Sequence, residues 1–121
     1  MKFTNDKAIF LQIAEHFFDS ILAGKWEEEE RIPSVREMAT FMEVNPNTVV
    51  RTYAYLQEQD VVFNKRGLGY FVSPSAKAKI KGIKRDQLIN HELPKLFNAM
   101  RLLDIGIDEL SEHFKRFQSK I

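Results

Sequence analysis

The dipeptide Asn45-Pro46 constrains this chain more than any other feature, because it ends one helix and begins the next. A residue that precedes proline is pushed out of the α region, so a helix arriving from the N-terminal side has to stop before it. Asparagine is a favoured N-cap, and proline suits the first helical position, where its missing amide hydrogen costs nothing. We therefore expect one helix to end shortly before Asn45 and another to cover residues 46–59.

The preceding helix has its own start signal. Ser34 and Glu37 are spaced as in a capping box, in which the serine oxygen accepts an orphan amide and the glutamate reaches back to the N-cap. Apolar residues then follow at helical spacing, at Val35, Met38, Ala39 and Met42. Two short helices joined by a turn of about three residues are typical of a helix-turn-helix.

A further helical segment precedes this pair, and a β-hairpin follows it. Apolar residues at helical spacing predict the first helix, which should stop at Gly24. Short strands are predicted at residues 61–63 and 70–72, separated by a basic, glycine-containing turn. Three helices and a two-stranded wing make a winged helix-turn-helix, so we predict a mainly α fold with a small β-hairpin over residues 1–75.

Residues 76–121 are predicted to form a two-helix C-terminal dimerisation tail. Their long apolar periodicity is interrupted at Pro94, where we expect a kink or a short break, because an interior proline costs a helix roughly 3 kcal/mol or more. Gly106 should end this segment, and Asp108 should cap a last helix. A segment this short cannot build a good core alone, so a second copy of the chain is its natural cover. The predicted dimer contacts are Ile89, Leu93, Leu96, Phe97, Met100, Leu103, Leu110, Phe114 and Phe117.

Several stretches, in order and at their observed separations, resemble the DNA-binding domain of the GntR family of bacterial transcription regulators. They are IFLQIA (9–14), IPSVREMA (32–39), VNPNTV (44–49), YAYL (53–56) and RGLGYFV (66–72). The short tail, with no room for a ligand-binding domain, is similar to the YtrA-type subgroup, in which the tail forms the dimer. The resemblance implies a sequence-specific DNA-binding transcription regulator that acts as a homodimer on a palindromic operator. Repression is the expected mode, because most members of the family repress.

The chain departs from the family pattern at three positions. Glu43 and Asp60 stand where the family commonly has glycine at a helix end, which puts the turn geometry in question. Val50 stands where some relatives carry an arginine that contacts DNA, and we expect Arg51 to take that role here.

On a helical wheel, Asn47 and Arg51 lie opposite the apolar face of helix 46–59 and point outward together. Asparagine can read adenine and arginine can read guanine in the major groove, although both residue types also contact phosphates. Asn45 and Thr48 are candidate phosphate contacts, yet each is fully explained as an N-cap or first-turn residue. Tyr55 either packs inside the domain or faces the DNA.

Other candidate DNA contacts lie outside this helix. Arg36 occupies the first turn of its helix, where the macrodipole disfavours a cation. The matching arginine in the family contacts DNA; the alternative is a salt bridge to the acidic run at residues 27–30. Lys65, Arg66 and Gly67 at the wing tip suit the minor groove or its flanking phosphates, unless they only keep the hairpin soluble.

Net charge alone does not decide the partner. The chain carries +1 overall, but residues 1–75 hold 8 Lys and Arg against 11 Asp and Glu. That negative balance supports one alternative, a winged-helix protein-interaction module that never touches DNA. A small-molecule effector acting near the Pro94 kink is a further possible partner, and nothing in the sequence identifies it.

Composition excludes several other classes. There is no cysteine, no apolar run approaches the roughly 20 residues that span a bilayer, and no secretory signal is visible, so we expect a cytoplasmic protein. The three histidines lack metal-like spacing, and no nucleophile–base pair or phosphate loop is found. We therefore expect no enzyme activity, no cofactor and no metal.

Overall fold

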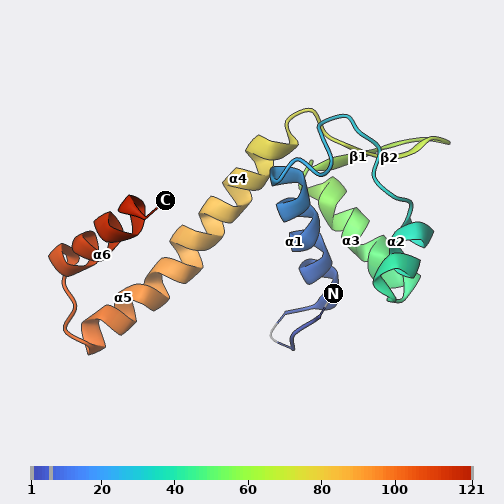
Figure 1. Cartoon of the computed structure of the whole chain (residues 1–121). Coiled ribbons are helices and arrows are strands. Elements are labelled where there is room, and N and C mark those ends of the chain that lie inside the picture. Colours follow the sequence, from blue (N-terminus) through green and yellow to red (C-terminus); the bar gives the residue numbers. More distant parts are fainter. Residues whose placement is uncertain (1, 6, 121) are drawn as a thin grey trace. The chain divides into compact units, whose positions relative to one another are not determined.

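The structure, a computed structural model, describes residues 2–5 and 7–120, so residues 1, 6 and 121 lie outside it. The described chain falls into two units, one that extends past residue 75 to Gly82 and one that begins at Ile83. The first unit contains α1 (Ile9–Leu22), α2 (Val35–Met42), α3 (Pro46–Glu58), β1 (Val62–Lys65), β2 (Gly69–Val72) and the first part of α4 (Ala76–Gln87) (Figure 1). The second contains the rest of α4, the π-helical turn η1 (Leu88–Glu92), α5 (Leu93–Leu102) and α6 (Ile107–Ser119). The predicted fold class, mainly helical with a small two-stranded wing, is confirmed.

Side-chain caps fix where α2 and α3 begin. The Ser34 Oγ accepts the Glu37 N–H at 3.1 Å, and the Glu37 carboxylate accepts the Ser34 N–H at 3.0 Å. The Asn45 Oδ1 accepts the Asn47 N–H at 2.8 Å, with Pro46 as the first residue of α3. Both start signals read from the sequence are confirmed.

The capping box makes a prediction about acid stability. Hydrogen bonds from the Ser34 backbone and then from its side chain lower the pKa of Glu37. A carboxylate whose pKa is lowered by folding stabilises the folded state above its unfolded pKa, about 4.3, and this contribution is lost as the pH falls through the folded pKa. We expect Glu37→Gln to show a shallower loss of unfolding free energy than wild type between pH 5 and 3, measured by urea titration. Glu28→Gln is the control, and identical pH profiles for Glu37→Gln and wild type would contradict the prediction.

Glu43 and Asp60, which stand where the family commonly has glycine, both follow a helix end. Glu43 has φ 56° and Asp60 has φ 60°, so both residues adopt the left-handed conformation that glycine usually supplies at a helix end. Such a conformation costs a non-glycine residue about 1–2 kcal/mol. Both helix ends therefore have a left-handed residue although neither has a glycine.

The core of the first unit fixes the inner face of α3. Tyr53 is fully buried and packs edge-on against Phe17 of α1, with ring centroids 5.5 Å apart. Burial raises the pKa of Tyr53, and its hydroxyl donates to the carbonyl of Pro33 at 2.6 Å. On the other side, the Thr52 hydroxyl donates to the carbonyl of Phe10 at 3.0 Å. These contacts leave the opposite face of α3 free to meet a partner.

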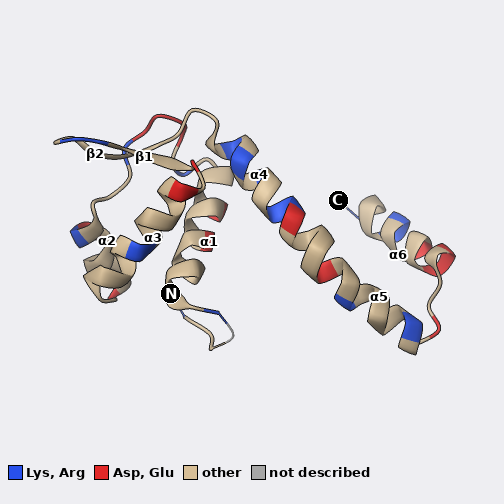
Figure 2. Cartoon of the chain, turned by 180° about the vertical axis from the view of Figure 1, so that it is seen from behind, with Lys and Arg blue, Asp and Glu red and all other residues tan. Residues whose placement is uncertain are grey.

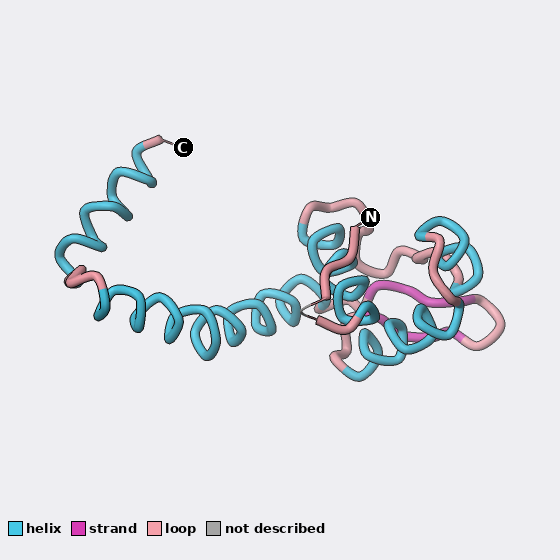
Figure 3. The backbone as a smooth tube through the Cα atoms, turned by 90° about the horizontal axis from the view of Figure 1, so that it is seen from below, coloured by secondary structure: helices cyan, strands magenta, loops and turns pink. Residues whose placement is uncertain are grey.

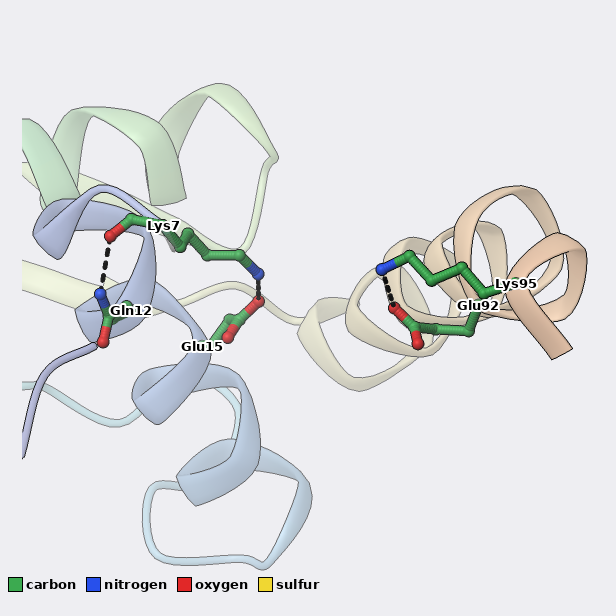
Figure 4. Close-up of polar contacts among 5 residues, drawn as sticks. All are labelled: Lys7, Gln12, Glu15, Glu92 and Lys95. Atoms are coloured by element: carbon green, nitrogen blue, oxygen red, sulfur yellow. Dashed lines mark hydrogen bonds and ion pairs between the residues drawn. The ribbon is translucent and has the colours of Figure 1, made fainter. Parts of the chain in front are cut away.

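A buried glutamine ties the N-terminal segment to α1. The Gln12 Nε2 donates to the carbonyls of Thr4 and Lys7, at 2.9 and 2.7 Å, and its Oε1 accepts the Thr4 N–H at 3.0 Å. Lys7 also forms an ion pair with Glu15, as Figure 4 shows. Thr4 and Lys7 are thereby held to α1 by directed polar contacts.

The wing contains a third backbone segment besides its two strands. β1 and β2 pair antiparallel and lie side by side (Figure 3), with Val62 opposite Val72 at one end and Lys65 opposite Gly69 at the other. Residues 29–32 continue the pairing on the other edge of β2: the Ile32 N–H donates to the Tyr70 carbonyl at 2.9 Å. The loop before α2 is therefore attached to the wing.

α4 begins at Ala76, in a stretch rich in lysine (Lys77, Lys79, Lys81 and Lys84). Ala76 and Ile80 are fully buried one helical turn apart, and the Lys79 Nζ lies 3.2 Å from the Asp60 carboxylate. Two apolar residues, Ala76 and Ile80, among several lysines are too weak a periodic signal to be read as a helix.

The chain stays helical at Pro94 instead of breaking there. The turn just before it, η1, is π-helical. An extra residue in the turn relieves the clash between a proline ring and the carbonyl one turn earlier. Of the two expected outcomes, a kink or a short break, the break is wrong, and the widened turn accommodates Pro94.

The start of α6 also differs from expectation. Gly106 is its N-cap and Asp108 lies in the first turn, not at the cap. A carboxylate there still interacts favourably with the helix dipole.

Candidate nucleic-acid interface

The outward face of α3 is a narrow stripe opposite its buried side. Asn47, Val50 and Ala54 are exposed along it at helical spacing, whereas Val49 and Thr52 are buried. Asn47 stands in the first turn, where its side-chain amide is open to solvent. Asn45 lies just before it with its Oδ1 engaged in the cap.

Arg51 lies toward α1 and not in the middle of this stripe. Its guanidinium carbon is 4.1 Å from the centroid of the Phe10 ring. The side chain remains exposed, so the cation–π contact holds the guanidinium beside α1 while N–H donors stay accessible. A planar donor group held at the flank of a helix suits a phosphate better than a base in front of the helix.

Thr48 and Tyr55 are both half-buried. The Thr48 carbonyl accepts the Thr52 hydroxyl at 3.1 Å. The Tyr55 ring lies 6.2 Å from Phe10 and 6.4 Å from Phe18, and burial, first among several causes, raises its pKa. Of the two roles that the sequence left open for Tyr55, these contacts favour packing.

Arg36 is exposed in the first turn of α2. Within the described residues it forms no ion pair with the acidic run, and Glu27 of that run instead lies 3.5 Å from the Lys77 Nζ. The guanidinium is therefore available to an external anion.

The wing tip presents cations on a two-stranded hairpin with stacked aromatic rings. Phe63 and Phe71 stack across the strands with centroids 5.8 Å apart, and the Lys65 Nζ lies 4.7 Å from the Phe71 centroid. Arg66 and Gly67 follow in the turn, where Gly67 has φ +79°, a conformation that glycine adopts without strain. Lys65 is thus held against an aromatic face, with Arg66 exposed beyond it.

Arg31 is a further basic residue at the wing, and no sequence motif identifies it as a candidate DNA contact. Its backbone forms a β-bridge with Phe71, and its side chain lies beside Gly69. A Cβ at Gly69 would lie only 2.9 Å from the Arg31 Nε, so the glycine leaves room for the arginine. Because this contact joins residues far apart in the sequence, a local pattern could not reveal it.

Charge is unevenly distributed over the first unit. Figure 2 shows basic segments at the hairpin tip and at the first turn of α2, while an acidic loop precedes α2. Contacts with phosphates are made locally, and remote carboxylates are screened within about 8–10 Å. The negative balance of residues 1–75 therefore does not oppose an anionic partner at the basic segments.

The second unit leaves a large apolar surface exposed. Phe114 is 58% exposed and Phe117 is 66% exposed, whereas Met100 is buried within its own unit. The other predicted dimer contacts are exposed at Ile89, Leu96, Phe97 and Leu103, and half-buried at Leu93 and Leu110. Between α5 and α6 lies an apolar hollow lined by Leu96, Leu110, Ser111, Phe114 and Lys115.

The histidines have other surroundings than a metal site. His16 is half-buried beside Phe17, and burial lowers its pKa; the His113 ring lies 3.5 Å from the Glu109 carboxylate. Over residues 2–5 and 7–120, no three His, Cys, Asp or Glu side chains gather closely enough to hold a metal ion. In the same part of the chain, no helix combines the length and apolar character needed to cross a membrane.

Comparisons with known proteins agree with this geometry. The family model described as bacterial regulatory proteins, gntR family, matches residues 10–72. YhcF of Bacillus subtilis (strain 168), an uncharacterized HTH-type transcriptional regulator, is 34% identical over 116 residues, which cover 96% of this chain and 94% of that protein. The HTH-type transcriptional repressor YtrA of the same organism is 28% identical over 113 residues, covering 93% and 86%. A crystal structure assigned to the GntR family, from Bacteroides thetaiotaomicron, superposes with a TM-score of 0.83 at 44% identity, covering 93% of this chain and 98% of that one.

Proposed function

This chain belongs to the GntR family of bacterial regulatory proteins and is a DNA-binding transcriptional regulator, and on that premise we propose that it acts as a homodimeric repressor. In this proposal α3 enters the major groove and the wing lies beside it. A dimer bound at a promoter blocks polymerase by occupancy, and its two-fold symmetry requires a roughly palindromic operator. The similarity to a relative named as a repressor supports this sign of regulation. A regulator that binds DNA in this way acts in the cytoplasm.

The observation that carries the proposal is the set of exposed cations on α2, α3 and the wing. Arg36 lies on α2, Arg51 on the α1 side of α3, and Lys65 and Arg66 on the wing. Phosphate contacts position a protein on the duplex, whereas base contacts specify the sequence. We assign the positioning role to these four residues, together with Asn45, Thr48, the Gly67 backbone and Arg31.

The base-reading role is assigned to the stripe itself. Asn47 lies in the first turn of α3, from which a side-chain amide can make paired hydrogen bonds to adenine. Tyr55 supports α3 by packing its ring near Phe10 and Phe18 of α1.

Dimerisation is assigned to the second unit, from Ile83 onward, and DNA binding to the unit that ends at Gly82. The exposed apolar side chains of α5 and α6 would be covered by the same surface of a second copy. Each fully buried Leu or Phe contributes roughly 1.5–3 kcal/mol, so several of them suffice to hold a dimer.

The proposal is tested by selecting duplexes from a random library with the full-length chain. We expect enrichment of one roughly palindromic sequence. A protein-interaction module without DNA binding would enrich none, and that outcome would overturn the proposal.

The wing should account for part of the salt dependence of binding to the selected duplex. If each subunit neutralises about 3–5 phosphates, log affinity should fall with log salt at a slope of roughly −5 to −9 for the dimer. Lys65→Ala/Arg66→Ala removes four cations per dimer, so we expect the slope to become shallower by about 2–4. Lys25→Ala/Lys81→Ala, which removes two cations of the same unit outside the hairpin, is the control. An unchanged slope for the wing variant would place the wing outside the interface.

A further inference from the structure

Val50 is an apolar residue in the exposed stripe of α3. Its side chain is 51% exposed, whereas the adjacent Val49 is fully buried. A β-branched residue is also a mediocre helix former, so helix propensity gives no reason for a valine at this exposed position. Its neighbours along the stripe are Asn47 before it and Ala54 after it.

The stripe around Val50 contains no cation. Arg51 is the one Lys or Arg of α3, and its guanidinium lies over Phe10 toward α1. Reading guanine through O6 and N7 is typically done by Arg or Lys. The stripe formed by Asn47, Val50 and Ala54 therefore has the wrong chemistry for guanine and offers one amide flanked by apolar groups.

We propose that Val50 determines operator specificity by packing against the 5-methyl group of a thymine in the major groove. The inference rests on the proposed placement of α3 in that groove. Thymine is the base that presents a methyl group there, and apolar side chains recognise it by contact. Asn47, one turn before Val50, is suited to adenine, so the two residues together specify neighbouring A·T pairs in each half-site. The small Ala54, one turn further on, leaves room for the base to approach.

The test uses the duplex selected by the full-length wild-type protein. Each thymidine is replaced in turn by deoxyuridine, in both half-sites, which removes the methyl group and leaves the Watson–Crick pairing unchanged. We expect wild-type affinity to fall about 3- to 10-fold at one or two thymine positions and to change less than about 2-fold elsewhere. Val50→Ala should bind the all-thymine duplex more weakly by a similar factor and lose the penalty at those same positions.

Val50→Thr is the matched variant, because it keeps one methyl group and should retain part of the deoxyuridine penalty. Alanine is the better helix former, so Val50→Ala should fold, and a urea titration verifies this. The inference is overturned if wild type is indifferent to every deoxyuridine, or if Val50→Ala keeps the full penalty. If wild type selects no duplex at all, the proposed function itself is contradicted. If wild type selects a duplex strongly but does not respond to loss of any thymine methyl group, only the role proposed for Val50 is contradicted.

Discussion

Phe114→Asp/Phe117→Asp in the full-length chain is expected to yield a monomer and to weaken operator binding by about 10²- to 10⁴-fold. Both phenylalanines are more than half exposed on α6, and Phe114 also lines the hollow between α5 and α6, so a urea titration has to verify that the variant keeps its fold. Burying two carboxylates per subunit at an apolar interface would cost several kcal/mol and prevent association. Two linked DNA-binding units gain affinity from their effective concentration, and a monomer loses that gain.

Sedimentation at micromolar concentration measures the first effect, and fluorescence anisotropy on the selected duplex measures the second. Gln118→Asp adds a carboxylate at an exposed polar position of α6 and should remain a dimer. A wild-type chain that sediments as a monomer, or a double variant that remains dimeric, would contradict the assignment of α6 to the dimer.

Point substitutions are preferable here to truncating the tail. A chain that ends at Ser75 would lack Ala76 and Ile80, both fully buried in the first unit. Its weaker DNA binding would then combine lost dimerisation with a damaged domain. Because the first unit ends at Gly82 and not at Ser75, substitutions on α6 test the dimer hypothesis better than a truncation at Ser75.

What the sequence predicts well is local in the chain. The capping box of Ser34 and Glu37 and the Asn45-Pro46 start of α3 depend on residues two or three positions apart, and both are present as predicted. The wing follows from two short apolar runs around a glycine-containing turn. The two caps act within one helical turn and the wing within one hairpin, so no contact between distant segments is needed.

What the sequence misses depends on contacts between distant segments. A helical wheel places Arg51 outward, but Phe10 of α1 attracts its guanidinium sideways. Arg31 lies beside Gly69 only because the loop before α2 pairs with β2. These two differences alter the candidate interface. Arg51 moves from the outward stripe of α3 to its edge, and Arg31 adds a cation to the wing.

Arg36→Ala should lower affinity for every duplex while raising the stability of the folded protein. Arg36 is exposed in the first turn of α2, where a cation opposes the helix dipole by about 0.3–1 kcal/mol. Its removal relieves that unfavourable interaction, and alanine is also the best helix former. A phosphate contact made by a charged donor contributes roughly 1.5–2 kcal/mol, and a dimer makes it twice, so affinity should fall about 10²- to 10³-fold.

A fall in DNA affinity together with a rise in folding stability distinguishes an arginine that binds DNA from one that supports the fold. Affinities on the selected duplex and on each of its single-base variants should fall by a similar factor in Arg36→Ala, because a phosphate carries no base identity. Asn47→Ala should instead flatten discrimination at one or two base pairs. Urea titration should give a midpoint for Arg36→Ala at or above that of wild type, and Arg36→Lys, which keeps the charge, should recover part of the affinity. If Arg36→Ala lost stability together with affinity, Arg36 would be supporting the fold of α2 and not holding DNA.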